Sequence, residues 1–587
     1  MTEPVENACS GEPETGKSTV LQLACSRLFL LGSVFVLAYA IVAVRVFDLM
    51  IVQGTGGETR QEREELDRLA RGGDLIEQAR RGNIYDRNGV LLATSLKTPA
   101  LFADPVLILD KPAVAKSLSE IFPDLVETET LSKIDVKKSR YEWLRDNVSP
   151  AQQERVLELG EPGLAFEYDD SRIYPLGRMT AHLLGYTDRT GRGLSGVERS
   201  AQSELAGGGD VTLTIDVRLQ HALRREIQQT MDEFSASAGA GMIMDVHTGD
   251  ILAGVSLPDY DLNLGTALAA DPEKNEGVLS NRLTLGVYEF GSVFKIFTTA
   301  ALLETQDTPL SATFDARSPI RIGRFTINDY HAQKRILTVP EVFMHSSNIG
   351  SALMARAVGA QKIQGFLSDL GLMARRKFDI LEVGAPLTPK PWGEASTVTV
   401  SYGHGISITA LQLCAATATI VNGGLQVHPR LIHPATPVIK PQARIISEET
   451  SEKMRALMRL VVTQGTGKKA DVPGYYVGGK TGTAEKSAGK KGYKTKSLLS
   501  SFIGAFPIDN PQYLVFVMID EPQGTKQSYG YATGGWTAAP AVARIVTSMA
   551  AILGLPSDRY DPAQDISLPL ERYIKPEHTE KKKLASN

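Results

Sequence analysis

The sequence contains little cysteine and no surplus of positive charge, and each shortage excludes a class of protein. Two of its three cysteines, Cys9 and Cys25, lie in or before the first apolar segment. Cys414 therefore has no partner farther along the chain, and we expect no disulfide there. A net charge of -4 provides no basic surface for phosphates, so we expect no nucleic-acid partner. No HExxH motif or Cys/His cluster indicates a metal site, and we expect neither a metal nor a cofactor.

Long apolar runs are also scarce, because one lies near the start of the chain and no second follows it. Residues 28–44 carry no charge and lie between Arg27 and Arg45. As a helix this run spans roughly 25 Å, enough for one membrane crossing. We therefore predict a cytoplasmic tail over 1–27 and a transmembrane anchor over 28–50. A cleavage site at Ala38-Tyr39-Ala40 is the alternative, but the apolar run continues beyond the point where a signal peptide ends.

Two glycine-rich segments imitate nucleotide-binding loops. Residues 11–18 match G-x-x-x-x-G-K-[ST], but a phosphate loop follows a strand, and residues 1–10 are polar and contain proline. Residues 191–196 match G-x-G-x-x-G, but the polar residues 187–190 precede them. We interpret the first segment as part of the tail and the second as a turn.

Residues 51–206 are mixed and charged, and we predict that they form a non-catalytic pedestal domain. Residues 84–93 resemble two short strands around Asn88-Gly89, which is typical of a type I′ hairpin. Ser149 with Gln152 three residues later predicts a capped helix over 150–159. We find no cluster of titratable residues here, so a spacer or docking role is the simplest interpretation.

The composition changes near residue 207, where three glycines form a linker. Strands are predicted at 211–215, 240–245, 251–255, 499–506 and 513–519, and helices at 216–234, 293–303, 339–344, 349–358 and 540–553. Strands at both ends with helices between them favour an α+β domain over 207–556, with an antiparallel sheet flanked by helices and an all-helical insert. We expect residues 557–587 to be a flexible C-terminal tail.

Three short motifs carry the candidate chemistry. They are Ser292-Val293-Phe294-Lys295, Ser346-Ser347-Asn348 and Lys480-Thr481-Gly482-Thr483. Ser292 and Lys295 are one helical turn apart at the start of an apolar, buried helix, so the hydroxyl and the amine can meet. A lysine can activate a serine when burial, a second cation and a helix N-terminus lower the lysine pKa. Lys480 is the candidate for that second cation.

Each motif taken alone has an ordinary structural explanation. Ser292 could be a helix N-cap beside a snorkelling lysine, and the second motif could be another cap. The third motif could belong to a glycine-bulged edge strand over 475–483. Another S-x-x-K at residues 487–490 lies in a polar stretch with no buried helix. The occurrence of all three motifs in this order favours a serine acyl-transfer enzyme.

With these motifs the chain resembles the class B penicillin-binding proteins, from the predicted anchor to about residue 553. Further matching segments are Arg81–Gly89, Tyr174–Gly177, Ala181–Gly185, Gly193–Glu198, Leu213–Asp216 and Tyr288–Gly291. Within the family the chain is most similar to the division-specific FtsI type and less similar to the elongation type. It departs from the family pattern at Phe290 and at Ala410, where relatives usually have proline.

The resemblance implies a peptidoglycan D,D-transpeptidase that cross-links stem peptides during septal cell-wall synthesis and is covalently inhibited by β-lactams. Ser292 would attack the penultimate D-alanine carbonyl of a stem pentapeptide, with Lys295 as the base. Ser346 would relay the proton to the leaving amine.

The resemblance also assigns roles in substrate binding. Asn348 would hold the acyl side chain, and Lys480 with Thr481 would bind the terminal carboxylate. Gly482 would let the peptide approach the strand. The backbone N–H groups of Thr483 and of the nucleophilic serine would form the oxyanion hole.

The same resemblance implies a location and partners. The protein would be a single-pass protein of the cell inner membrane with its catalytic domain in the periplasm. No glycosyltransferase domain has room before residue 205, so glycan polymerisation would need a SEDS-family partner of the FtsW type, together with other divisome membrane proteins.

Three other classes share parts of this pattern. A class D-like β-lactamase would typically have a hydrophobic residue in place of Asn348 and would not need the pedestal. A penicillin-sensing receptor would keep the serine but would need cytoplasmic signalling domains, which this sequence lacks. A histidine-based serine hydrolase would use His345 or His404.

Overall fold

The computed structural model describes residues 80–123, 125–136, 139–322, 325–434, 442–487, 493–557 and 561–575, all within one unit that begins at Ala79. The predicted tail, the predicted anchor and the motif at 11–18 lie outside these residues. No helix among the described residues is both long and apolar enough to cross a membrane.

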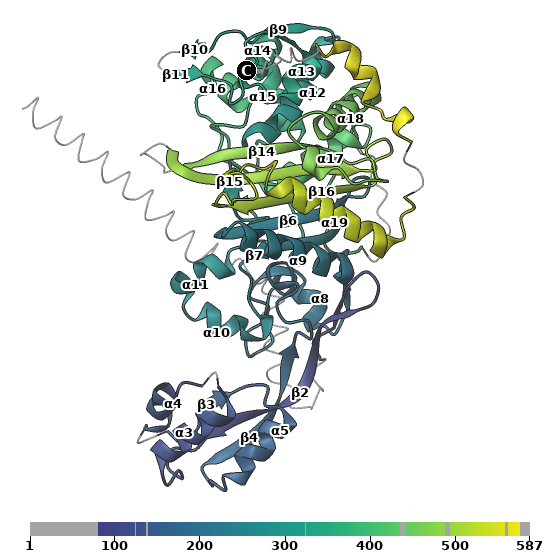
Figure 1. Cartoon of the computed structure of the whole chain (residues 1–587). Helices are drawn as coiled ribbons and strands as arrows, with labels where there is room; N and C mark the ends of the chain where they lie inside the picture. Colours follow the sequence, from purple (N-terminus) through teal and green to yellow (C-terminus); the bar gives the residue numbers. More distant parts are fainter. Residues whose placement is uncertain are drawn as a thin grey trace, which may run out of the picture. The chain divides into compact units, whose positions relative to one another are not determined.

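The pedestal contains a five-stranded sheet with strand order β3-β2-β1-β5, in which β4 pairs with β2 (Figure 1). Its strands are β1 (Ile84–Tyr85), β2 (Leu91–Ala103), β3 (Glu142–Arg145), β4 (Leu164–Ile173) and β5 (Val211–Thr212). The long antiparallel pair of β2 and β4 runs from Thr94 opposite Ile173 to Ala103 opposite Leu164. The parallel pair of β1 and β5 joins the pedestal to the chain that enters the second domain.

Three helices pack beside the β2–β4 ribbon around a small core of their own. They are α3 (Lys111–Ile121), α4 (Glu127–Ile134) and α5 (Pro150–Glu158), and their core includes Leu101, Leu118 and Phe122. The predicted start of α5 is confirmed, because Ser149 and Gln152 form a reciprocal capping box.

The hairpin at 84–93 is present, but its predicted type I′ turn is wrong. A type I′ turn needs positive φ at both central residues, and only Gly89 has it, at +84°. The carboxylate of Asp86 instead accepts hydrogen bonds from the backbone N–H groups of Asn88 and Val90, both at 2.8 Å. This side chain closes the turn in place of the backbone geometry that Asn-Gly suggested.

A cluster of charged side chains lies within the pedestal, although the sequence indicated none. Glu198 of α7 (Gly196–Ser200) is fully buried and pairs with Arg81 at 2.6 Å and with Arg172 at 2.7 Å. Arg172 also donates to the carbonyl of Gly82. The cluster escaped sequence analysis because its members are far apart in the chain and meet only after folding.

The second domain is built on a five-stranded sheet with strand order β14-β15-β16-β6-β7, in which all neighbours are antiparallel (Figure 1). The strands are β6 (Ala238–Asp245), β7 (Ile251–Leu257), β14 (Gly478–Ser487), β15 (Tyr493–Phe506) and β16 (Tyr513–Asp520). The predicted antiparallel α+β domain is thereby confirmed. Strands β6, β7 and β16 are almost entirely buried, because helices cover both faces of the sheet.

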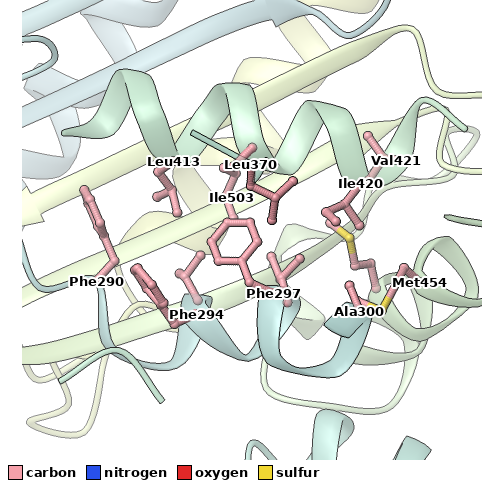
Figure 2. Packing of buried hydrophobic residues seen from close by; sticks show 14 of the residues in the cluster. Phe290, Phe294, Phe297, Ala300, Leu370, Leu413, Ile420, Val421, Met454 and Ile503 are labelled. Atoms are coloured by element: carbon pink, nitrogen blue, oxygen red, sulfur yellow. The ribbon is translucent and has the colours of Figure 1, made fainter. Parts of the chain in front are cut away.

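One face of the sheet is covered by α9 (Val217–Glu233) and α19 (Ala538–Leu553), and the other by α12 (Lys295–Gln306), α17 (Ala410–Val421) and α18 (Glu448–Thr463). Figure 2 shows Phe297 and Ala300 of α12 facing Leu413 and Ile420 of α17, with Ile503 of β15 beside them. Each of the larger side chains here, the phenylalanine, leucine and isoleucines, contributes roughly 1.5–3 kcal/mol through its burial. This packing fixes α12, which begins beside Ser292.

The prediction of an all-helical insert between β7 and β14 is wrong in part. The insert includes α10 (Gly265–Ala269), α11 (Pro272–Leu279), α13 (Val339–Met344), α14 (Asn348–Val358), α15 (Ala360–Asp369) and α16 (Glu394–Val400). It also includes three short antiparallel pairs: β8 (Val287–Tyr288) with β13 (Ile408–Thr409), β9 (Thr313–Asp315) with β12 (Ile336–Thr338), and β10 (Ile320–Ile322) with β11 (Phe325–Ile327). Strands of two or three residues are too short to produce an alternating pattern.

The prediction of a flexible tail over 557–587 is wrong for residues 561–575. These residues form two 3-10 turns, η6 (Pro562–Gln564) and η7 (Leu568–Tyr573). Leu570 is only 4% exposed and belongs to the main core, and Asp565 is only 6% exposed. The polar composition of the segment concealed this packing. Residues 576–587 lie outside the described part of the chain.

Candidate active site

Ser292 lies in a short 3-10 turn, η3 (Gly291–Phe294), and α12 begins at Lys295 rather than at residue 293. Gly291 has a positive φ of +55°, and a Cβ at this position would lie 2.6 Å from the carbonyl oxygen of Thr483. Only glycine therefore lets the turn lie this close to β14. The turn brings the first and third motifs together.

The amine of Lys295 is the group in contact with the candidate nucleophile. Its side chain is fully buried, and Nζ lies 2.7 Å from Ser292 Oγ. Nζ also donates to the carbonyl of Ser346 at 2.9 Å and to Asn348 Oδ1 at 2.7 Å. Burial and the nearby charge of Lys480 hold the pKa of Lys295 well below its usual value. This shift favours the deprotonated amine, which can accept the serine proton.

The second motif forms the turn between α13 and α14. Ser347 is the N-cap of α14, and its hydroxyl accepts a hydrogen bond from the N–H of Gly350. Ser346 has a φ of +58°, which is unfavourable for a residue with a side chain. This conformation points both the carbonyl and the hydroxyl of Ser346 at the buried lysines.

The third motif lies on β14, an edge strand of the sheet. Lys480 is fully buried, and its Nζ donates to Ser346 Oγ at 2.9 Å and to the carbonyl of Thr481 at 3.3 Å. Burial lowers the pKa of Lys480 to about 7. Because Lys295 Nζ is 3.1 Å from the same hydroxyl, Ser346 lies between the two amines. The three motifs thus meet through one serine side chain.

The glycine of the third motif packs closely against the turn that carries Ser292. A Cβ on Gly482 would lie 2.4 Å from Ser501 Oγ and 2.6 Å from the carbonyl oxygen of Phe290. A Cβ on Gly534 would likewise lie 2.4 Å from the carbonyl oxygen of Gly482. These residues pack backbone against backbone beneath the nucleophile turn. Gly534 also donates its N–H to Thr483 Oγ1 at 3.1 Å.

Sequence analysis missed one acidic residue that holds the second motif in place. Asp329 accepts hydrogen bonds from the Ser347 hydroxyl at 2.7 Å and from the N–H of Ile349 at 2.9 Å. Its negative charge opposes the fall in the pKa of Lys295. The amide of Asn348 donates to the carbonyl of the neighbouring Asn328 at 3.0 Å. No motif marks this loop, which lies 18 residues before Ser347.

The structure favours a lysine base over a histidine base. The nitrogen within hydrogen-bond distance of Ser292 Oγ is Nζ of Lys295. His404 Nδ1 lies 3.4 Å from Glu289 Oε2, and that carboxylate also accepts the N–H of Gly405. His345 caps the end of α13 through its backbone N–H.

A serine beside one buried lysine, linked through a second serine to another, at the edge of an antiparallel sheet, defines a penicillin-interacting serine acyl-transferase. Residues 239–547 match the family described as the penicillin binding protein transpeptidase domain, and residues 76–218 match the penicillin-binding protein dimerisation domain. The chain belongs to the class B penicillin-binding proteins, which confirms the resemblance inferred from its motifs.

Individual relatives agree with this assignment. The chain is 39% identical over 506 residues to the probable peptidoglycan D,D-transpeptidase FtsI of Caulobacter vibrioides, covering 84% of both chains. It is 27% identical over 533 residues to peptidoglycan D,D-transpeptidase FtsI of Escherichia coli, covering 84% of this chain and 88% of that one. Among solved structures, penicillin-binding protein 3 of Mycobacterium tuberculosis in complex with aztreonam has a TM-score of 0.65 at 25% identity, covering 82% of this chain and 97% of that one.

Proposed function

We propose that this protein is a peptidoglycan D,D-transpeptidase that cross-links stem peptides through an acyl-enzyme on Ser292. The observation that carries the proposal is the contact of Ser292 Oγ with the fully buried amine of Lys295 at 2.7 Å. The names of the FtsI relatives support the same activity. β-Lactams, whose strained amide mimics D-Ala-D-Ala, react with the same hydroxyl.

Acylation begins when Lys295 accepts the proton of Ser292 and Oγ attacks the carbonyl of the penultimate D-alanine. The negative charge that forms on the carbonyl oxygen is held by the N–H groups of Ser292 and Thr483. The close approach of the nucleophile turn to the Thr483 carbonyl supports this pairing of donors.

Collapse of the tetrahedral intermediate requires a proton on the departing amine. Ser346 contacts both lysine amines, so its hydroxyl can pass a proton to the nitrogen of the terminal D-alanine. The carbonyl–nitrogen bond then breaks, and D-alanine leaves with its amine protonated. An amine from a neighbouring stem peptide attacks the ester, which forms the cross-link and frees Ser292.

Substrate binding is assigned to the remaining residues of the motifs. Lys480 and Thr481 bind the terminal carboxylate, which stabilises the lysine cation and raises its pKa above the value of about 7 in the free enzyme. Asn348 holds the acyl side chain, and Gly482 and Thr483 form the part of edge strand β14 that pairs with the peptide backbone.

The cellular setting forms the second part of the proposal. The FtsI names of the relatives favour a septal role over the elongation role that other class B enzymes have. The apolar run at 28–50 would anchor the chain in the inner membrane with the catalytic domain in the periplasm. A SEDS-family glycosyltransferase of the FtsW type and other divisome membrane proteins would be its partners. Localisation of a fluorescent fusion at the septum would support this setting, and uniform side-wall fluorescence would contradict it.

The activity is tested by incubating the purified full chain with benzylpenicillin and with a synthetic stem pentapeptide. We expect a stable adduct of one penicillin, located by peptide mass spectrometry on Ser292, and release of D-alanine from the pentapeptide. A β-lactamase would instead hydrolyse excess penicillin without accumulating the adduct. A receptor would form the adduct but would release no D-alanine.

A further inference from the structure

Residues 561–575, hereafter the C-terminal strap, pack against the elements that carry the second and third motifs. Figure 1 shows this yellow segment beside α13 and α18, and η7 contacts both helices. The strap lies outside the residues that match the transpeptidase family, which end at residue 547. Its position therefore raises the question of what it contributes to the site.

The first anchor of the strap is a buried arginine. Arg459 of α18 is fully buried, and its guanidinium pairs with Asp565 of the strap and with Asp471, both at 2.7 Å. The same group donates to the carbonyl of Val477 at 2.8 Å. Val477 directly precedes β14, the strand on which Lys480 lies. Through Arg459 the strap is thus connected to the start of that strand.

The second anchor is on α13. The hydroxyl of Thr338, the N-cap of α13, donates to the carbonyl of Tyr573 at 2.9 Å. The buried carboxylate of Glu341 accepts the backbone N–H of Lys575 at 2.7 Å. Because α13 ends at Met344, these contacts hold the helix that leads directly into the left-handed turn of the second motif.

The position of Ser346 is sensitive to both anchors. Its hydroxyl lies about 3 Å from the amines of Lys295 and Lys480, which are held by separate elements, and hydrogen bonds weaken steeply as such distances grow. Its positive φ is unfavourable and persists only while the surrounding structure imposes it. A small shift of α13 relative to β14 would lengthen one of these contacts.

We infer that the C-terminal strap is a positioning element of the acyl-transfer site, with Asp565 and Arg459 as positioning residues that hold α13 and β14 at the spacing Ser346 requires. The inference rests on the proposed function and extends it to a segment with no catalytic motif. The competing explanation is that the strap only closes the core, since Leu570 is buried there.

A pair of matched substitutions distinguishes the two explanations. Asp565→Asn keeps the size of the side chain but removes the charge that faces Arg459. Glu571→Gln makes the same chemical change in the same strap, at an exposed residue that accepts a hydrogen bond from Gln464. The second-order rate constant for acylation by a fluorescent penicillin is measured for both full-length variants across pH, well below their unfolding temperatures.

We expect Asp565→Asn to lower the acylation rate constant at least about tenfold and to displace its pH profile, because the environment of Lys480 changes. Glu571→Gln should match the parent protein. If Asp565→Asn lowers only the unfolding temperature and the rate and pH profile stay unchanged, the strap has no positioning role. If the unmodified chain itself takes up no penicillin, the proposed function fails instead.

Two truncations give an independent test. A chain ending at Lys575 keeps the strap and should acylate normally, whereas a chain ending at Ser557 should acylate at least about tenfold more slowly. A synthetic peptide of residues 558–575 should restore the rate of the shorter chain. Equal rates for the two truncated chains would overturn the inference, and if the shorter chain does not fold, the matched substitutions decide.

Discussion

Two regions of this protein each bury a pair of basic side chains. One pair faces a buried carboxylate, and the other does not. In the pedestal, Arg81 and Arg172 face the fully buried carboxylate of Glu198. In the active site, Lys295 and Lys480 face the uncharged hydroxyl of Ser346. Among the described residues, neither lysine forms an ion pair with a carboxylate.

The difference distinguishes charged groups that stabilise the fold from charged groups that take part in the reaction. A buried carboxylate between two guanidinium groups offsets their charge, and the cluster joins segments of the pedestal that lie far apart in the chain. Burial without such a partner disfavours the charged amines, so the pKa values of both lysines fall, which supports the base role proposed for Lys295. The predictions below test this division, from the largest expected effect to the smallest.

Removing the nucleophile gives the largest effect. Ser292→Ala should abolish covalent labelling by a fluorescent penicillin, a loss of more than about 10³-fold, because the labelled oxygen is gone. The matched control is Ser487→Ala, the serine of the other S-x-x-K. In-gel fluorescence compares the two variants, and undiminished labelling of Ser292→Ala would refute the assignment.

Removing the unpaired base comes next. Lys295→Ala should lower the acylation rate constant about 10²–10⁴-fold while reversible binding of the penicillin changes much less, because the amine acts in proton transfer. In the parent protein the rate should fall as the pH drops and Lys295 becomes protonated. Lys486→Ala is the control, since that lysine is paired with Asp520 on the same sheet. Similar acylation by both variants would exclude Lys295 as the base.

Removing the carboxylate of Glu198 should lower the free energy of unfolding and leave the rate of acylation unchanged. Glu198→Gln leaves two buried guanidinium groups without their counter-charge, and we expect the free energy of unfolding to fall by about 3–5 kcal/mol. Glu167→Gln, at an exposed position on β4, should change it by less than about 0.5 kcal/mol. Denaturant unfolding measures both, and acylation is followed on the folded protein. A slower acylation with unchanged stability would contradict the division.

Removing the second unpaired cation should raise stability. The pKa of Lys480 falls from 10.5 to about 7 on folding. The unfolded chain therefore binds more protons between these values, and stability should rise with pH across this range. Replacing Lys480 by an uncharged residue removes this pKa shift, which should raise the free energy of unfolding by about 5 kcal/mol below pH 7. The hydrogen bonds lost with the amine should lower it by about 1 kcal/mol each.

The Lys480→Met variant should thus have a free energy of unfolding roughly 3 kcal/mol higher than that of the parent protein at pH 6.5. This difference should shrink as the pH approaches 10.5. Thermal unfolding at several pH values checks the prediction. A variant that is less stable than the parent at low pH would show that Lys480 is compensated by a charge.

Local features of the sequence were predicted well, because they depend on neighbours in the chain. Ser149 and Gln152 form their capping box wherever the helix packs, and the two apolar runs of β6 and β7 on either side of a short turn specify a hairpin. The three motifs predicted the site for a different reason, since their combination is specific to one family. Their spacing in the chain says nothing of their distance in space.

Features that depend on distant parts of the chain were missed. Glu198 accepts a hydrogen bond from Arg81, which lies 117 residues earlier in the sequence. Asp329 contacts the second motif from an irregular loop. The strap was interpreted as a free tail because its buried residues, Asp565, Ser567 and Leu570, have no periodic apolar pattern around them. Each of these residues has an ordinary local environment in the sequence and acquires its role only through tertiary contacts.

Three closely packed glycines around the turn that carries Ser292 limit how resistance to β-lactams can arise. Gly291, Gly482 and Gly534 each lie where even a methyl group would collide with backbone atoms. Any replacement there would displace the hydroxyl that cell-wall synthesis itself requires. We therefore expect clones selected under β-lactam pressure to keep these three glycines and to change at other residues around Ser292, where a side chain can hinder the antibiotic and still admit the peptide.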